Sequence, residues 1–209
     1  MILTISRQLG SGGRSASRLI ASHYGISVYD KKLIELAAEQ SGLHRQFFEQ
    51  ADEKVSRPFR SFLFGSRSAT GHGVTPDMAG NPLWGDALFK VQSDVIRDIA
   101  GREPSCIILG RCADYILRDV PGHVSIFITA DLDDRVRRYA EHDGIADAEA
   151  QALIEKGDAR RASYYNYYTQ RKWGDAANYD LCLNSSRLGI EGTARQIIRF
   201  VDELQAAQS

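Results

Sequence analysis

The sequence has no long hydrophobic run and no excess of one charge. None of its apolar stretches reaches the roughly 20 residues that a transmembrane helix requires. Its start also lacks the basic segment followed by an apolar stretch that is typical of a secretory signal. The 26 basic and 27 acidic residues give a formal net charge of −1, so overall charge gives no reason to expect nucleic acid or a membrane as a partner. We expect a soluble, cytoplasmic protein.

Patterns typical of metal sites and disulfides are missing as well. The three cysteines, Cys106, Cys112 and Cys182, are an odd number and have no metal-ligand spacing. We interpret them as buried, reduced thiols. The five histidines are scattered without ligand spacing, which argues against a transition-metal site.

Short apolar runs alternate with longer segments of helical period, which is typical of a parallel sheet with helices on both faces. The predicted strands are Ile2 to Ile5, Ile26 to Tyr29, Cys106 to Leu109, Val124 to Thr129 and Tyr179 to Asn184. The predicted helices are Ser15 to Tyr24, Lys31 to Ser41, Pro82 to Gly101, Ala113 to Arg118, Asp131 to Asp143, Asp147 to Tyr168 and Ile190 to Ala206. A length of 209 residues suits one α/β domain over residues 1–209, with its ligand at the carboxyl ends of the strands.

A glycine-rich loop separates the first predicted strand from the first predicted helix. Residues 9–15 read Leu-Gly-Ser-Gly-Gly-Arg-Ser, with glycines at positions 10, 12 and 13. Glycine allows a positive φ and a close approach to an anion, so that consecutive N–H groups can point at phosphate oxygens. This order of strand, glycine turn and helix predicts a phosphate-binding loop.

The lysine expected in such a loop is absent. In the ungapped register Gly13 takes the lysine position and Arg14 follows it. A shift by one residue puts Arg14 in the lysine position, but then Gln8 stands where the first glycine belongs. An arginine is a planar fork on a bulkier stem than a lysine ammonium, so the two are not equivalent. The nearby cations that can replace the lysine are Arg7, Arg14, Lys31 and Lys32.

Over nearly its whole length the chain resembles the cytidylate kinase-like family of P-loop nucleoside monophosphate kinases. The resemblance rests on Leu3-Thr-Ile5, the loop Gly10 to Ser15, Val28-Tyr-Asp30, Gly110-Arg111, Ala130 to Arg138, Asp158-Ala-Arg160-Arg161, Tyr179 to Ser185 and Gly189-Ile-Glu191 in serial order. It implies a three-layer P-loop NTPase fold with a five-stranded parallel sheet and a helical lid. The lid is expected at residues 144–173, where basic and aromatic residues crowd together after Asp158.

The resemblance also implies the site residues. The cofactor-binding residues are Gly10, Ser11, Gly12, Gly13, Arg14 and Ser15, and the Ser15 hydroxyl binds Mg²⁺ directly or through water. The catalytic residues are Arg14, Arg111, Arg135, Arg138, Arg160 and Arg161, and the substrate-binding residues are Asp30, Arg111 and Asp114.

For three of these residues a plainer interpretation stays open. Ser15 also fits a helix N-cap, and Asp30 fits an N-cap of the helix expected from Lys31. Asp114 also fits a surface or capping aspartate.

The implied activity is ATP-dependent phosphoryl transfer to a nucleoside monophosphate, with ATP and Mg²⁺ as cofactors and CMP or dCMP as the first candidate acceptors. The matching acceptor site usually has an arginine where Leu36 stands, and residues 46–81 replace the usual acceptor-binding insert with a segment lacking a clear period. That segment is expected to be a flexible insert near the acceptor, or an excursion without a role. Another small acceptor, such as dephospho-coenzyme A, therefore stays open, and the missing lysine leaves open a catalytically weak nucleotide-binding regulatory protein. The sequence leaves the oligomeric state undecided.

Overall fold

A computed structural model describes residues 1–30 and 82–208 of the chain. The predicted helix Lys31 to Ser41 and the predicted insert 46–81 lie outside these residues. The described elements, in chain order, are β1 (Ile2–Arg7), α1 (Gly13–Tyr24), β2 (Ser27–Tyr29), α5 (Pro82–Arg102), β3 (Cys106–Leu109), α6 (Ala113–Ile116), β4 (His123–Thr129), α7 (Leu132–Asp143), α8 (Asp147–Thr169), the 3₁₀ helix η1 (Ala176–Asn178), β5 (Leu181–Asn184) and α9 (Ser185–Gln208).

The five strands form one parallel sheet in the order β2-β3-β1-β4-β5, which confirms the predicted sheet. β1 lies at its centre and is almost fully buried from Ile2 to Ser6. Continuous apolar runs of this kind suit strands that are covered on both faces. β2 and β3 lie on one side of β1, and β4 and β5 lie on the other. The order in which strands are added therefore reverses at β1. Ligands of such sheets bind where the strand order reverses, outside the carboxyl ends of the strands.

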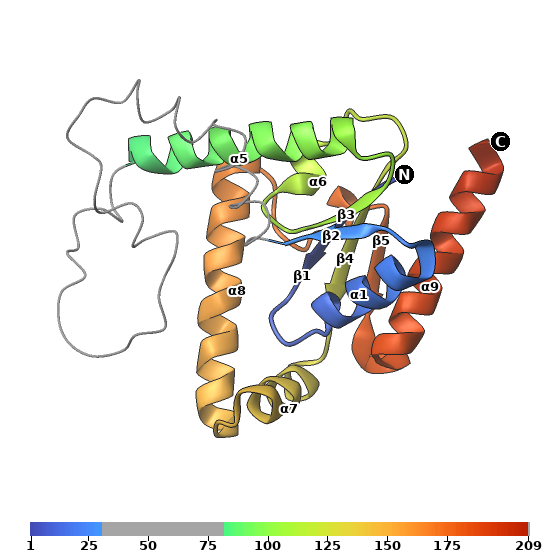
Figure 1. Ribbon diagram of the computed structural model, residues 1–209. Helices are drawn as coiled ribbons and strands as arrows, with labels where there is room; N and C mark the ends of the chain where they lie inside the picture. The colour runs from blue at the N-terminus through green and yellow to red at the C-terminus, as the bar shows by residue number, and fades with distance from the viewer. Residues whose placement is uncertain (31–81, 209) are drawn as a thin grey trace.

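Helices cover both faces of the sheet and give the three-layer arrangement seen in Figure 1. On one face, α1 and α9 pack against the sheet through Ile20, Ile197 and Val201. On the other face, α5, α6 and part of α8 pack through Val95, Ile116 and Tyr165. The helical pattern in the sequence therefore predicted both outer layers.

Helices α7 and α8 form a hairpin that projects from one end of the sheet, at the bottom of Figure 1. Val136 and Ala140 of α7 pack against Ala150 and Ile154 of α8 in a small core of their own. Gly144 ends α7 in the left-handed conformation that a helix C-terminus commonly requires. Residues 144–173, predicted as the lid, comprise the turn of this hairpin, helix α8 and the segment that follows α8. Their role as a lid stays a prediction.

Most predicted boundaries are close to the observed ones, and the differences have local causes. β1 continues two residues further than expected because its pairing with β4 runs to Arg7 and Ile128. β5 begins late because the Asp180 carboxylate accepts hydrogen bonds from the backbone and hydroxyl of Ser125. The last helix begins at Ser185 and is interrupted at Gly189, whose φ of +67° and ψ of 174° are not helical.

The cysteines and the helix lengths can be compared with what the sequence predicted. Cys106 and Cys112 are buried thiols, as expected, whereas Cys182 is exposed on β5, which corrects its assignment as a buried thiol. Burial raises the pKa of Cys106 to about 11 and that of Cys112 to about 12, so both stay protonated at neutral pH. Among the described helices, none combines the length and apolar character that a membrane span requires.

Candidate active site

The glycine loop lies between the end of β1 and the start of α1, as predicted. Gly10 and Gly12 have φ values of +78° and +77°, which favour glycine. A Cβ on Gly10 would lie 2.6 Å from the carbonyl oxygen of Arg135. Gly12 is the N-cap of α1 and supplies no side-chain cap, so the first N–H groups of α1 have no capping partner from it. Such a helix start attracts anions.

Contacts from distant parts of the chain hold the loop in shape. The N–H of Leu9 donates to Asp158 Oδ1 on α8 at 2.8 Å, and Ser185 Oγ at the start of α9 donates to the carbonyl of Ser11 at 2.7 Å. The Ser11 side chain is fully buried and donates to the carbonyl of Gln8 at 2.8 Å. Its hydroxyl therefore stabilises the loop and does not face a cofactor.

A cavity of about 690 Å³, here called the loop cavity, opens in front of this loop. Its polar lining comes from the loop and from α7, together with Arg7 of β1 and Arg161 of α8, and includes the carboxylates of Glu141 and Asp143. The predicted site residues that line it are Gly10, Gly12, Gly13, Arg14, Ser15, Arg138 and Arg161. Ser15 lies within α1, two residues after its start, so it is not the N-cap, which corrects that interpretation. Arg138 Nη1 also donates to Ser185 Oγ at 3.0 Å, which connects α7 to α9.

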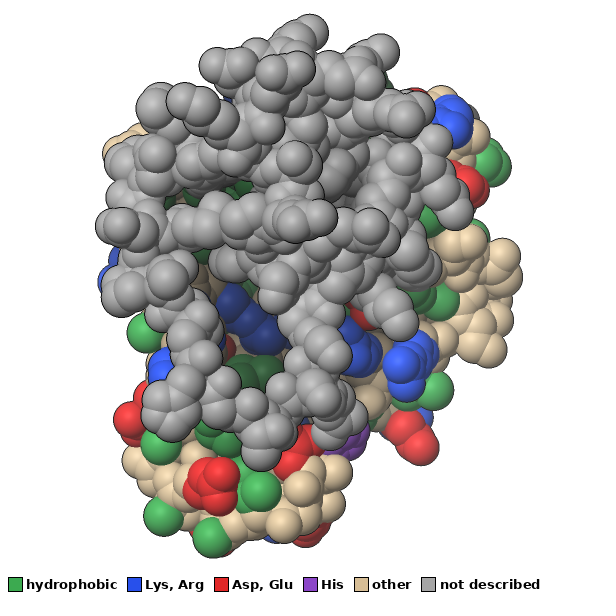
Figure 2. Space-filling view, turned by 60° about the vertical axis from the view of Figure 1, so that its left-hand side comes forward, with side chains coloured by type: hydrophobic (Ala, Val, Ile, Leu, Met, Phe, Trp, Pro, Cys, Tyr) green, Lys and Arg blue, Asp and Glu red, His purple; other side chains and the backbone are tan. Residues whose placement is uncertain are grey.

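A second cavity of about 430 Å³, here called the arginine cavity, lies at the ends of β1 and β3 and against α8. Four arginines line it, Arg7, Arg111, Arg160 and Arg161, and no acidic residue is present among its described lining residues. Figure 2 shows basic side chains near the middle of one face of the molecule and acidic ones mostly toward its lower half. An anion is the ligand that this lining favours.

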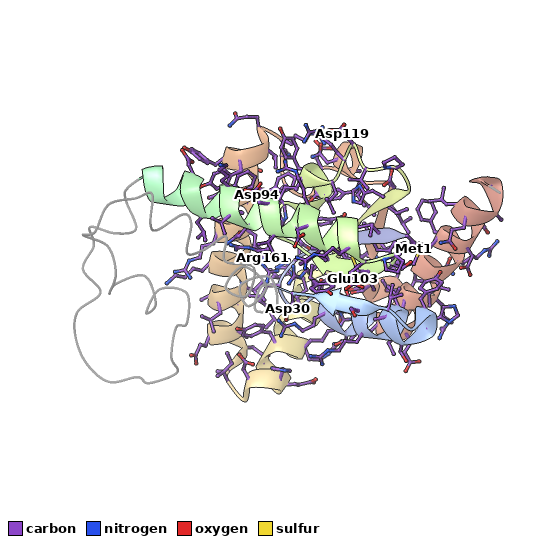
Figure 3. The ribbon with its side chains drawn as sticks, turned by 45° about the horizontal axis from the view of Figure 1, so that its top comes forward. Met1, Asp30, Asp94, Glu103, Asp119 and Arg161 are labelled. Atoms are coloured by element: carbon purple, nitrogen blue, oxygen red, sulfur yellow. The ribbon has the colours of Figure 1, made fainter. Side chains whose placement is uncertain are left out.

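Arg7 and Arg161 line both cavities and therefore lie where the two meet. Arg161 Nη1 donates to the Arg7 carbonyl oxygen at 2.9 Å. Burial, together with the charges of Arg161 and Arg14, lowers the pKa of Arg7 to about 10, and burial also lowers the pKa of Arg161. Arg7 remains charged at neutral pH. Figure 3 shows Arg161 on α8 and Asp30 at the end of β2 near the centre of the molecule.

Arg111 is held in place by contacts from α5 and α8. Its Nε donates to Gln92 Oε1 at 3.0 Å, and its guanidinium lies 5.0 Å from the centre of the Tyr164 ring. The Tyr164 hydroxyl donates to the same Gln92 oxygen at 3.1 Å. The Gln92 Nε2 is buried and has no hydrogen-bond partner among the described residues. Gln92 thus fixes the direction of Arg111 and keeps a donor for another group.

Asp114 lies behind the arginine cavity and is not part of its lining. It is buried, and it accepts a hydrogen bond from the Tyr165 hydroxyl at 2.7 Å and a longer one from Ser6 Oγ at 3.4 Å. Burial raises the pKa of Asp114, although the hydrogen bond from Tyr165 opposes this shift. Tyr165 lines the cavity, so Asp114 contacts this lining through the Tyr165 hydroxyl. The interpretation of Asp114 as a surface aspartate is wrong.

Arg135, Arg14 and Asp30 are engaged by other residues. Arg135 is buried, pairs with Asp158 at 2.8 Å and lines neither cavity. Arg14 pairs with Asp30 at 2.9 Å and is largely exposed. The structure therefore assembles most of the predicted residues around two cavities that share Arg7 and Arg161, whereas Ser11, Asp30, Asp114 and Arg135 line neither.

Two further residues, Arg7 and Gln92, belong to this site, and only Arg7 could be considered from the sequence. Arg7 was one of four cations considered for the missing lysine, and it is the one that borders both cavities. Gln92 gave no signal, because it lies 19 residues before Arg111 in the middle of a helix. Their roles follow from how β1, α5 and α8 meet in space.

Comparison with known proteins gives the family. The sequence profile of the cytidylate kinase-like family matches residues 2–187. The chain belongs to the cytidylate kinase-like family. It is 24% identical to the cytidylate kinase of Pyrococcus horikoshii over 206 residues, which cover 98% of this chain and 90% of that protein. It is also 24% identical to the cytidylate kinase of Methanopyrus kandleri, over 98% of this chain and 94% of that protein.

Solved structures give the same fold. An uncharacterized protein from Eubacterium ventriosum superposes with a TM-score of 0.71 at 27% identity, over 97% of this chain and 98% of that one. The shikimate kinase of Bacteroides thetaiotaomicron superposes with a TM-score of 0.52 at 14% identity, over 97% of this chain and 98% of that one. The chain therefore has the P-loop kinase fold that the resemblance implied.

Proposed function

We propose that this protein transfers a phosphoryl group from ATP to a nucleoside monophosphate, with CMP and dCMP as the first acceptors to test. The observation that carries the proposal is that two cavities, one at a glycine loop and one lined by arginines, share Arg7 and Arg161. A phosphoryl donor and an anionic acceptor bound in them would meet at these two cations. Membership of the cytidylate kinase-like family supports the same reaction.

The loop cavity suits the triphosphate of the donor. The open start of α1 offers backbone N–H groups to the phosphates, and Arg138 adds a positive charge from α7. Ser15 is exposed in the first turn of α1 and lines this cavity, so its hydroxyl would hold Mg²⁺. No group of three or more His, Cys, Asp or Glu side chains able to hold a metal is found among the described residues. This fits an ion that phosphate oxygens hold together with Ser15, and bound there Mg²⁺ would neutralise phosphate charge.

The arginine cavity suits the phosphate of the acceptor. Arg111 and Arg160 line only this cavity of the two, whereas Arg161 reaches both. In the transfer, an oxygen of the acceptor phosphate forms a bond to the γ-phosphorus of ATP, and the bond between that phosphorus and the bridging oxygen breaks, so ADP leaves. The chain's own contribution is to position the two nucleotides and to stabilise the charge on the group in transit.

An ADP-release assay with ATP, Mg²⁺ and a panel of acceptors tests the proposal. The panel contains CMP, dCMP, UMP, AMP and GMP, with dephospho-coenzyme A as an acceptor of another class. We expect turnover with at least one nucleoside monophosphate, fastest with CMP or dCMP. Turnover with dephospho-coenzyme A alone would move the assignment to another small-molecule kinase.

The loop itself favours a second candidate, a nucleotide-binding regulatory protein, because Gly13 stands where the ungapped register places the lysine. Loss of that charge removes stabilisation of the transition state unless another cation replaces it. Tight ATP binding without ADP release for any acceptor in the panel would favour this candidate.

A further inference from the structure

A side chain at position 13 has no room, because the Arg7 side chain lies against Gly13. Gly13 begins α1, and it is absent from the residues with positive φ, so the backbone at this position does not itself demand glycine. A Cβ on Gly13 would lie 2.8 Å from Cβ and 2.9 Å from Cγ of Arg7. Such separations are shorter than real side chains tolerate. The stem of Arg7 thus occupies the space that a side chain at position 13 would need.

The tip of the Arg7 side chain extends from Gly13 to the end of β3. Arg7 Nη1 is the nearest atom to the place where a Cβ on Gly110 would stand. Gly110 has a φ of +68° and, like Arg7, belongs to the lining of the arginine cavity. The guanidinium therefore lies between the start of α1 and the end of β3, at the junction of the two cavities.

The charges around Arg7 leave an excess of positive charge at this junction. Arg161, Arg14 and Arg111 all lower the pKa of Arg7, whereas among the described residues the carboxylate of Asp30 raises it. Asp30 already pairs with Arg14 at 2.9 Å. A phosphate group is the kind of anion that would compensate these charges and accept the hydrogen bonds of the guanidinium.

We propose that Arg7 takes the place of the P-loop lysine and binds the phosphoryl group that passes between the cavities. The positive charge then comes from the end of strand β1 instead of from helix α1. Arg14 is a weaker candidate, because it lines only the loop cavity and its guanidinium already pairs with Asp30 at 2.9 Å. Lys31 and Lys32 lie outside the described residues. The proposal rests on the proposed function for the identity of the phosphoryl donor.

The first experiment measures the binding of ATP, ADP and AMP by calorimetry to the wild type, Arg7→Met and Arg18→Met. Methionine keeps much of the stem that packs on Gly13 and removes the charge. Arg18 lies exposed on α1 and lines neither cavity, so Arg18→Met is the matched control. We expect Arg7→Met to weaken ATP binding by about ten- to hundredfold, the usual effect of losing a charged hydrogen bond, and to weaken the binding of AMP, which lacks the transferred phosphoryl group, by a smaller factor. An unchanged ATP affinity in Arg7→Met would overturn the proposal. So would a loss of AMP affinity as large as the loss of ATP affinity, or a loss of ATP affinity in Arg18→Met as large as that in Arg7→Met.

The second experiment moves the charge back to the helix. Arg7→Ala empties the space beside position 13, so Arg7→Ala with Gly13→Lys rebuilds a loop with a lysine, and Arg7→Ala with Gly13→Ala is its control. We expect the lysine variant to bind ATP at least about tenfold more tightly than the alanine control. Equal affinities in two variants that both unfold cooperatively on heating would contradict the role of Arg7.

These binding measurements separate the two proposals. If the wild type binds ATP but phosphorylates none of the acceptors, the proposed function fails, and the comparison of ATP with AMP still decides the role of Arg7. If acceptors are phosphorylated at the wild-type rate by Arg7→Met, the role of Arg7 fails and the proposed function stands.

Discussion

At the scale of single residues, the site depends on glycines, which have no side chain, as much as on its arginines. Gly10, Gly12 and Gly13 each lie against a neighbour that would collide with a Cβ, namely Arg135, Ile190 and Arg7. The loop is thus packed against the rest of the molecule on several sides. Its glycines serve close packing in addition to backbone freedom.

Gly10→Ala is expected to destabilise the protein more than Gly25→Ala does. Both glycines have positive φ, +78° and +65°, so both substitutions add similar backbone strain. A Cβ on Gly10 meets the Arg135 backbone, whereas a Cβ on Gly25 meets nothing within 4 Å. We expect Gly10→Ala to cost about 1–3 kcal/mol more in the free energy of unfolding, measured in urea. Equal costs would show that the loop can move away from α7.

Asp114→Asn is expected to change the pH dependence of stability. Burial raises the pKa of Asp114 above its value of about 4 in the unfolded chain, so the folded state binds this proton more tightly. Stability that depends on this group therefore falls as pH rises from about 4 through the folded-state pKa. Asparagine does not titrate, so the variant should gain stability relative to the wild type over that range. Urea unfolding at a series of pH values measures the difference, and a difference that is independent of pH contradicts the prediction.

At the scale of elements, Asp158 connects three parts of the molecule. Its Oδ1 accepts from the N–H of Leu9 in the loop, and its Oδ2 accepts from Arg135 of α7 at 2.8 Å. Arg135 is buried and Asp158 is largely buried, with side-chain exposures of 6% and 15%. The α7–α8 hairpin is therefore attached to the glycine loop through one carboxylate.

Asp158→Asn should destabilise the protein strongly. The asparagine oxygen can still accept from Leu9, but Arg135 would be left as a buried charge without its partner, which usually costs about 3–5 kcal/mol. Glu203→Gln is the control, because its ion pair with Arg199 is 74% and 64% exposed. Exposed pairs of this kind contribute less than about 1 kcal/mol. Unfolding in urea measures both, and similar costs for the two variants would contradict the buried role of Asp158.

The elements were the part of the structure that the sequence predicted well. Cys106 to Leu109 is observed as predicted, since a short apolar run that is buried on both faces has few alternatives. Errors arose where tertiary contacts decide: Arg7 continues β1 because β4 pairs with it, and Asp180 is held outside β5 by Ser125. The site was harder to predict. No local pattern shows that the stem of Arg7 lies across Gly13, because that contact depends on the angle at which α1 leaves the sheet.

At the scale of the whole molecule, the two cavities are neighbours beside β1, where the strand order of the sheet reverses. The loop cavity lies beside α7 and the arginine cavity beside β3 and α8, and both include Arg7 and Arg161. Ligands in the two cavities are therefore close enough to share cations. A single molecule long enough to enter both cavities would gain from each.

We expect a compound that joins adenosine and cytidine through an oligophosphate chain to bind more tightly than ATP or CMP alone. Linking two ligands makes the second binding event intramolecular, and the gain is typically about 10²- to 10⁴-fold. Calorimetry with the linked compound, ATP and CMP measures this gain. The same compound with adenosine at both ends is the control for the acceptor cavity. A linked compound that binds no better than ATP would show that the cavities cannot be occupied together.

The contact between Arg7 and Gly13 also limits how this loop can change in evolution. A side chain gained at position 13 while Arg7 remains would be crowded against its stem. In the role that we propose for Arg7, its loss while Gly13 remains would leave the loop with neither Arg7 nor a lysine. Each single step is unfavourable, so the two positions are expected to change together. In an alignment of relatives, residues larger than glycine at the position of Gly13 should therefore occur with small residues at the position of Arg7, as a correlated pair.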